Sequence, residues 1–221
     1  MTNRVKIPVY FMPGMAASPL IFEHIELPTA CFEVFRLEWI PPLKGESLKD
    51  YARRMSRNIR HPDPVLIGVS FGGMLVQEMA PFVNPRKLII ISSVKTRDEL
   101  PGKMKFAHYT GVHKLLPTSL VTNVEFIARY AFGKGISKRL KRYEKYLAVK
   151  DKDYVDWAIN EIVHWKRTTP VPGIIHIHGD KDPVFPISCI KECIRVKGGT
   201  HIMIINRSRW FNEHLPSLIE N

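Results

Sequence analysis

The chain of 221 residues, 45% of them hydrophobic, is long enough to enclose one sizeable core, so we expect a single domain. Lys and Arg outnumber Asp and Glu by 33 to 21, and the resulting charge of +12 favours anionic ligands, membrane surfaces or nucleic acid without distinguishing among them. Three cysteines, Cys31, Cys189 and Cys193, exclude a dense disulfide framework and favour small buried thiols in a reducing compartment. No apolar run approaches the roughly 18 residues needed to span a bilayer.

The N-terminal segment loosely imitates a secretory signal, because basic residues precede the fairly apolar stretch 7–22. That stretch is interrupted by Pro8, Pro13, Gly14 and Pro19. A continuous apolar region is what a signal peptide requires. We therefore expect a cytoplasmic protein.

The first part of the chain predicts alternating strands and helices. Residues 5–12 read as a strand that Pro13-Gly14 ends, and residues 31–37 alternate between apolar and polar side chains as a second strand does. Ser47 begins a helix with an apolar stripe on one face and arginines on the other. This helix leads to the buried run 64–69, and the order strand, helix, strand favours a parallel sheet.

A serine flanked by glycines follows that buried run. The residues Gly68-Val69-Ser70-Phe71-Gly72 fit the pattern G-x-S-x-G, and residues 74–80 predict a helix directly after them. A serine on a sharp turn between strand and helix has crowded neighbours, so flanking residues without side chains let its hydroxyl project. For these five residues alone, a glycine-rich turn with an incidental serine is the alternative.

The remaining elements continue the alternation of strands and helices. A fully apolar run beginning at residue 88 is typical of a strand buried on both faces. The helix over 151–167 has its apolar residues spaced to pack on a sheet. After it we expect a strand over 173–178, a short helix over 187–193, a last strand over 194–196 and a closing helix over 208–220.

Between these elements, residues 96–150 lose the apolar runs and show helical periodicity with many cations. We predict a helical lid inserted into the sheet domain. Its bulky side chains are Met104, Phe106, Tyr109, Leu115, Leu116, Phe126, Tyr130 and Phe132. A basic helix near its end places Lys138, Arg139, Lys141, Arg142 and Lys145 around an apolar face. A solvated outer face is the simpler interpretation of these cations, and an anion site is the alternative.

A serine hydroxyl is a poor nucleophile unless a base accepts its proton, and that base needs a carboxylate to orient it. Both residue types follow the late strands. Asp180 and Asp182 lie on a tight loop just beyond the strand 173–178, and His201 lies just beyond the strand 194–196, after a pair of glycines. His176 and His178 fall within a strand and are expected to be buried there with their hydrogen bonds satisfied.

In this order of motifs, from the first strand to the last helix, the chain resembles the α/β-hydrolase fold superfamily. The resemblance implies a mostly parallel central sheet with helices on both faces, and a triad of Ser70 as nucleophile, Asp182 as orienting acid and His201 as general base. Asp180 and, more distantly, Asp98 are the alternatives for the acid. The turn Gly68-Val69-Ser70-Phe71-Gly72 corresponds to the nucleophile elbow of that family. A serine rather than an aspartate at this elbow argues against the dehalogenase and epoxide-hydrolase branches.

The resemblance also implies an oxyanion hole made by two main-chain N–H groups. Phe71 would supply the first, and Met15, on the turn after the first strand, the second. The sequence has Pro13-Gly14 at that turn where the family usually has His-Gly. The donor is a main-chain group, so the role implied for Met15 does not require the histidine side chain.

No metal-binding, dinucleotide-binding or Walker motif is present, so we expect no cofactor and no metal. We predict a serine hydrolase acting on a small carboxylic ester or thioester, and the basic lid would suit an anionic acyl substrate. The alternatives are a hydrolase-like binding protein with little turnover, and a triad enzyme that cleaves a carbon-carbon bond or transfers the acyl group. We expect no nucleic-acid or membrane partner, and the oligomeric state is open.

Overall fold

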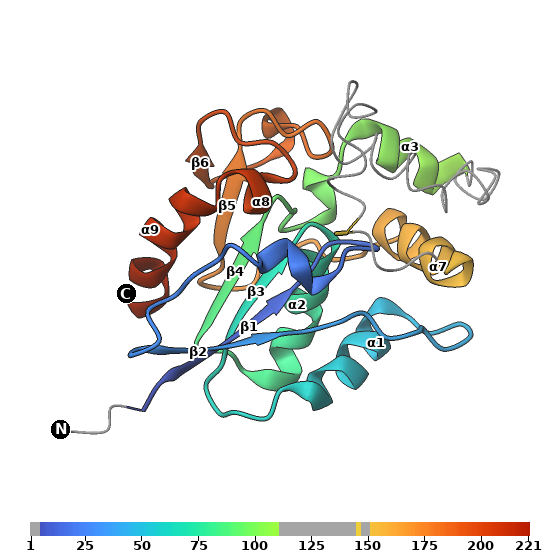
Figure 1. Cartoon of the computed structure of the whole chain (residues 1–221). Coiled ribbons are helices and arrows are strands. Elements are labelled where there is room, and N and C mark those ends of the chain that lie inside the picture. Colours follow the sequence, from blue (N-terminus) through green and yellow to red (C-terminus); the bar gives the residue numbers. More distant parts are fainter. Residues whose placement is uncertain (1–4, 111–144, 147–150) are drawn as a thin grey trace.

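The computed structural model describes residues 5–110, 145–146 and 151–221. Its centre is a six-stranded sheet with the order β2-β1-β3-β4-β5-β6, and every neighbouring pair of strands is parallel (Figure 1). The strands are β1 (Ile7–Met12), β2 (Phe32–Arg36), β3 (Val65–Val69), β4 (Lys87–Ile91), β5 (Ile175–Gly179) and β6 (Ile194–Val196). The expected parallel sheet is confirmed, with both edges formed by the less buried strands β2 and β6.

Successive residues of the central strands pack into two separate apolar cores, one on each face of the sheet. In β3, Leu66 belongs to the first core, whereas Val65 and Ile67 belong to the second. This division follows from the alternation of side chains along a strand. Because β3 and most of β4 are buried on both faces, their sequences read as continuous apolar runs.

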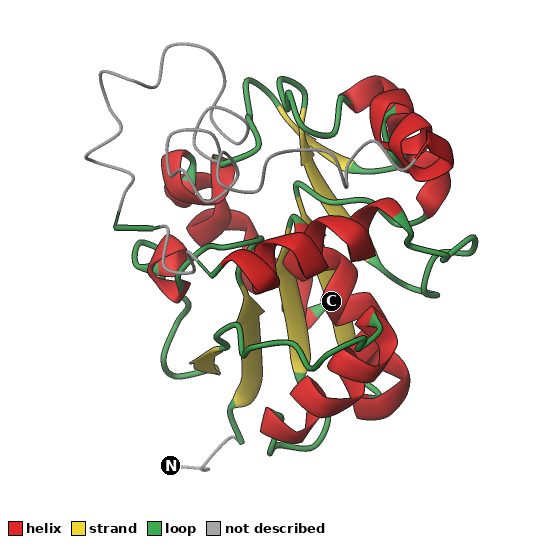
Figure 2. Cartoon of the chain, turned by 90° about the vertical axis from the view of Figure 1, so that its right-hand side faces the viewer, coloured by secondary structure: helices red, strands yellow, loops and turns green. Residues whose placement is uncertain are grey.

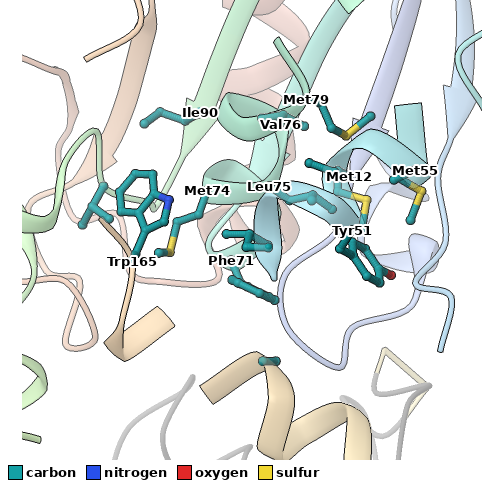
Figure 3. Packing of buried hydrophobic residues seen from close by; sticks show 14 of the residues in the cluster. Met12, Tyr51, Met55, Phe71, Met74, Leu75, Val76, Met79, Ile90 and Trp165 are labelled. Carbon is teal, nitrogen blue, oxygen red and sulfur yellow. The ribbon is translucent and has the colours of Figure 1, made fainter. Parts of the chain in front are cut away.

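Helices cover both faces. The first core packs against α1 (Leu48–Met55) and α2 (Phe71–Val83), and Figure 3 shows its methionines and aromatic rings in contact. The second core packs against α8 (Met203–Asn206) and α9 (Ser208–Glu220). Figure 2 turns the molecule so that the side carrying α1 and α7 faces the viewer. Short 3₁₀ helices span Pro19–Phe22, Ser56–Asn58, Arg97–Glu99 and Ile187–Cys189.

Three local expectations differ from the structure. The helix expected over 187–193 is only the 3₁₀ turn Ile187–Cys189, and α8 is an extra helical turn before α9. Helix α7 (Lys152–Val163) forms as expected and adds Val155 and Ala158 to the first core, but it lies beside α3 rather than flat on a face of the sheet (Figure 1). Its Tyr154 and Trp157 pack instead against aromatic residues of the loops and of the start of α2. Helical periodicity gives the buried face of a helix and leaves open what covers it.

The expected lid lies largely outside the described residues. Helix α3 (Gly102–Thr110) occupies its beginning, beside α7 (Figure 1), and exposes Phe106 and Tyr109. Met104, on the same helix, packs against the first core. The bulky residues from Leu115 onward and most of the basic helix fall in the undescribed ranges 111–144 and 147–150. The lid and the single domain stay predictions.

Two further findings concern whole classes of residues. All three cysteines carry free thiols and are half-buried rather than buried as expected. Within the described ranges, no helix is long and apolar enough to cross a membrane. The cytoplasmic location stays a prediction.

Because all six strands are parallel, their carboxyl ends meet at one edge of the sheet. The turn after β1 begins at Pro13, and Ser70 directly follows β3. Asp182 lies three residues beyond the end of β5, and His201 five residues beyond the end of β6. The topology therefore brings together segments that are up to about 190 residues apart in the chain, at the edge where open α/β sheets place their sites.

Candidate active site

Ser70 has a strained backbone at the junction of β3 and α2. Its φ of 54° and ψ of −122° lie in a region that residues other than glycine rarely adopt. Two hydrogen bonds hold this conformation: the Ser70 N–H donates to the Ile91 carbonyl (2.9 Å), and the Ser93 hydroxyl donates to the Ser70 carbonyl (2.7 Å). Both partners belong to β4 or to the residues directly after it, so the neighbouring strand fixes the turn.

The two glycines of the pattern are required by close backbone packing. A Cβ at Gly68 would lie 2.3 Å from the Gly72 carbonyl oxygen, and a Cβ at Gly72 would lie 2.3 Å from the Pro13 carbonyl oxygen. Both distances are far below van der Waals contact. The elbow therefore packs directly against the turn that follows β1.

The structure brings Ser70, His201 and Asp182 into one chain of hydrogen bonds. The Ser70 Oγ lies 2.9 Å from His201 Nε2, and His201 Nδ1 lies 2.9 Å and 3.1 Å from the two carboxylate oxygens of Asp182. His201 is 7% exposed and Asp182 is 4% exposed. Of these three residues, only Ser70 is partly exposed to solvent.

The other candidate acids lie elsewhere. Asp180 accepts a hydrogen bond from the Gly198 N–H (2.7 Å). This bond joins the loop after β5, which carries Asp180 and Asp182 and is called the acid loop below, to the loop that carries His201. Asp98 has an exposed side chain whose ionic neighbour is Arg97, at 4.0 Å. Neither carboxylate contacts His201 among the described residues, so the geometry favours Asp182.

The loops after β5 and β6 are packed backbone against backbone. Gly179 and Gly199 approach so closely that a Cβ on Gly179 would lie 2.3 Å from the Gly199 carbonyl oxygen. The Lys181 N–H donates to that same oxygen (2.9 Å). The separation of Asp182 and His201 is therefore set by the main chain.

The turn after β1 lies against the serine. A Cβ at Gly14 would be 3.3 Å from Ser70 Cβ and 3.9 Å from Ser70 Oγ. The N–H groups of Met15 and Phe71, the expected oxyanion donors, make no hydrogen bond within the described part of the chain. Both are therefore available to an acceptor beside Ser70.

Known structures share this architecture. A thermophilic esterase from Thermogutta terrifontis matches with a TM-score of 0.69 at 12% identity, over 99% of this chain and 91% of that one. A hydrolase from Pseudomonas aeruginosa gives 0.73 at 14% over 98% and 91%, and a bromoperoxidase from Bacillus anthracis 0.67 at 18% over 99% and 94%. The chain has the α/β-hydrolase fold.

No protein-family model matches the sequence, and no curated protein matches it at a significant level. The names of the three structural neighbours differ, so their likeness establishes the α/β-hydrolase fold and not the reaction.

The contacts of Asp182 make it an ionised hydrogen-bond acceptor. Its Oδ1 accepts from the N–H groups of Val184 (2.8 Å) and Phe185 (3.0 Å). Burial raises the pKa of Asp182, but the charge and hydrogen bond of His201 and the Phe185 amide lower it more, so the net pKa lies below its ordinary value. The carboxylate therefore stays charged opposite His201 Nδ1 at neutral pH.

Two buried histidines support the acid loop from behind. His178 Nε2 lies 2.8 Å from the Phe185 carbonyl and 3.6 Å from an Asp182 oxygen, and His178 Nδ1 lies 3.1 Å from His176 Nε2. Burial lowers the pKa of both histidines, so both are neutral at pH 7. Both are buried strand residues, as expected. The expected satisfaction of their hydrogen bonds fails at His176 Nδ1, which has no hydrogen-bond partner within the described residues. His178 contacts the loop of Asp182 directly, and His176 does so through His178.

Two aromatic residues at the site carry no motif. Trp39 donates its indole N–H to the Gly14 carbonyl (2.7 Å), and the Tyr154 hydroxyl accepts from the Ala16 N–H (3.3 Å). Each reaches the turn after β1 from a distant segment. Their only sequence signal is that they are aromatic residues near the ends of elements, which many core residues share.

The described residues contain no group of three or more His, Cys, Asp or Glu side chains arranged to hold a metal ion.

Proposed function

We propose that the chain is a serine hydrolase that cleaves a small carboxylic ester or thioester through an acyl-enzyme. The observation that carries the proposal is the continuous hydrogen-bond chain from Ser70 Oγ through His201 to Asp182. Such a chain has one strong chemical use: it lets a hydroxyl transfer its proton to an imidazole while attacking a carbonyl.

In the proposed reaction, Ser70 Oγ attacks the acyl carbonyl while His201 Nε2 accepts the hydroxyl proton. Asp182 holds His201 in the tautomer that keeps its proton on Nδ1 and stabilises the imidazolium as it forms. The N–H groups of Met15 and Phe71 donate to the oxyanion. His201 then gives the proton to the leaving group, and a water activated by the same imidazole releases the acid.

The fold neighbours and the charge support the substrate class. One neighbour is named as an esterase, and its structure holds bound malate, a small organic acid. The charge of +12 would favour an anionic acyl substrate by attraction over the whole surface. The fold also hosts other activities, so the acyl chain and leaving group are questions for the assay.

A fluorophosphonate probe, which phosphonylates activated serines, tests the proposal. We expect it to label the wild type and Ser217→Ala, which changes an exposed serine on α9, and to leave Ser70→Ala unlabelled. A series of chromogenic esters and thioesters of increasing acyl length, run on the same three proteins, gives the substrate preference. Equal labelling of the wild type and Ser70→Ala would refute the proposed nucleophile.

The second candidate is a binding protein that keeps the pocket and turns over little. It differs from the hydrolase in one measurable way: a ligand would raise the melting temperature while the ester panel shows no turnover. A triad enzyme that cleaves a carbon-carbon bond or transfers the acyl group would react with the probe but release no acid from the simple esters.

A further inference from the structure

The indole of Trp39 contacts the turn after β1, which we call the oxyanion turn because it carries the proposed donor Met15. Trp39 lies in the loop that follows β2, and its Nε1–H donates to the Gly14 carbonyl oxygen (2.7 Å). The same oxygen accepts from the Ala17 N–H (3.1 Å), which closes the turn. The Gly14 carbonyl is therefore held by one bond from within the turn and one from outside it.

The Gly14 carbonyl and the Met15 N–H belong to the same peptide group. A trans peptide is rigid and planar, and its C=O and N–H bonds point in opposite directions. No peptide bond of the described chain is cis. Fixing the direction of the Gly14 oxygen therefore also fixes the direction of the Met15 N–H, and Gly14 lies directly beside Ser70.

The ring of Trp39 also contacts the residue that carries the other donor. It stacks on the Phe71 ring with centroids 5.1 Å apart and planes 9° from parallel. Phe71 is only 1% exposed and directly follows Ser70. A single side chain thus touches both segments that supply the proposed oxyanion amides.

Neighbouring residues hold Trp39 itself in place. The ring of Tyr154 lies 5.4 Å from the Trp39 ring. The Tyr51 hydroxyl accepts from the Ile40 N–H (3.0 Å) and donates to the Ile40 carbonyl (2.8 Å), so α1 fixes the main chain directly after Trp39. The indole N–H is therefore pre-set in direction before any substrate binds.

We infer that Trp39 is a positioning residue for the oxyanion hole: its indole N–H aims the Gly14–Met15 peptide, and its ring braces Phe71 so that both amides face the developing negative charge. The inference rests on the proposed hydrolase function and deepens it. Because oxyanion contacts strengthen in the transition state, loss of this support lowers kcat more than it raises KM.

The test compares Trp39→Phe with Trp157→Phe. Trp39→Phe removes the indole N–H and keeps an aromatic ring beside Phe71. Trp157→Phe is the matched control, since its indole N–H donates to a backbone carbonyl at the same distance, Glu46 O at 2.7 Å, and its ring also contacts Phe71. Both variants lose one tryptophan N–H in the same aromatic cluster, but only one loses the bond to Gly14.

With the best ester of the panel, we expect Trp39→Phe to lower kcat by about 10- to 100-fold, less than the roughly 10²–10³ for deleting a donor outright, with KM changed by less than about threefold. A trifluoromethyl ketone, which forms a tetrahedral adduct on Ser70, should bind more weakly by a similar factor. Trp157→Phe should keep kcat within about threefold. An equal loss of kcat in both variants, or a change in KM alone, would overturn the inference.

A second measurement does not depend on turnover. The backbone amide resonance of Met15 should shift in Trp39→Phe and stay unchanged in Trp157→Phe. If the wild type is neither labelled nor active while this resonance moves, the proposed function has failed and the positioning of the turn stands. If the wild type is active but neither the resonance nor kcat responds to Trp39→Phe, the inference has failed and the proposed function stands.

Discussion

The two halves of the site are held in different ways. On the acid side, Asp182 is fixed by N–H groups two and three residues further along the chain, and its loop is joined to that of His201 by main-chain bonds. On the side of the proposed oxyanion donors, the turn after β1 is held by Trp39 and Tyr154, which are 25 and 138 residues away from their partners. The first half is organised by local backbone geometry and the second by tertiary contacts.

The difference is between hydrogen bonds formed within one loop and hydrogen bonds formed only when distant segments have packed together. An aspartate that accepts from the following N–H groups makes a turn wherever the chain places it. The turn after β1 instead takes hydrogen bonds from α7 and from the loop after β2, so this support exists only once those segments have packed. Substitutions should therefore act on chemistry in the first half and on both stability and chemistry in the second.

The largest expected effect tests the acid. Asp182→Asn keeps the shape of the side chain but removes the charge opposite His201 Nδ1, and we expect kcat to fall by about 10⁴, as when a triad carboxylate becomes an amide. Asp180→Asn is the control, because its Oδ1 can still accept from the Gly198 N–H. Steady-state kinetics of both variants would reverse our assignment if Asp180→Asn proved the more damaging.

The next effect concerns the contact between the elbow and the oxyanion turn. Gly72→Ala places a Cβ 2.3 Å from the Pro13 carbonyl oxygen and 2.6 Å from that of Met12. Backbone must shift to relieve this overlap, so we expect the free energy of unfolding to fall by about 1–3 kcal/mol. Gly102→Ala, which points into open space, should change it by less than about 0.5 kcal/mol. Urea denaturation distinguishes the two.

A smaller effect probes the histidines behind the acid loop through pH. Burial holds the pKa of His176 well below its ordinary value, with the charges of His178 and Lys95 acting in the same direction. The unfolded chain then binds the proton more readily, so this stabilisation is complete above about pH 6.5 and is lost as pH falls, by at most about 1.4 kcal/mol per pH unit for one group.

His176→Leu removes that titrating group and should flatten the decline in unfolding free energy between pH 7 and pH 5. Part of the decline should remain, because burial also lowers the pKa of His178. Urea denaturation at three pH values gives the dependence of the unfolding free energy on pH for the wild type and for His176→Leu. A variant as pH-sensitive as the wild type would show that His176 is not the group responsible.

The smallest effect isolates the second support of the oxyanion turn. Tyr154→Phe leaves the buried Ala16 N–H without its acceptor, at a cost of about 1 kcal/mol in unfolding free energy, and we expect kcat to fall only a few-fold. Tyr109→Phe, on the exposed face of α3, should match the wild type in both measurements. An unchanged melting temperature for Tyr154→Phe would mean that this long bond holds nothing in place.

The features predicted from sequence are those encoded over a few residues. Continuous apolar runs gave β3 and β4, and the glycines around Ser70 marked a turn whose close packing the structure confirms. The order of Ser70, Asp182 and His201 placed all three at the carboxyl edge of a parallel sheet. Each of these inferences needs only local pattern and strand direction.

What the sequence could not predict depends on partners far along the chain. Nothing near Trp39 or Tyr154 marks them as contacts of the turn after β1, because that contact exists only once separate elements have packed. The residues that cover the apolar face of α7 are a second case. The apolar periodicity of this helix is visible in the sequence, whereas the loops against which it packs cannot be identified there. Tertiary packing decides such contacts, and periodicity in one segment carries no information about it.

The proposed base, His201, follows β6, which is an edge strand of the sheet. Strand β6 is three residues long and has β5 as its neighbour on one side only, which is where a sheet frays most readily. Close backbone packing between Gly179 and Gly199, and the hydrogen bond from the Gly198 N–H to Asp180, hold this strand at its carboxyl end, which leads to His201. These contacts hold the end of the edge strand from which His201 projects, and they tie it to the loop of Asp182, which follows the inner strand β5.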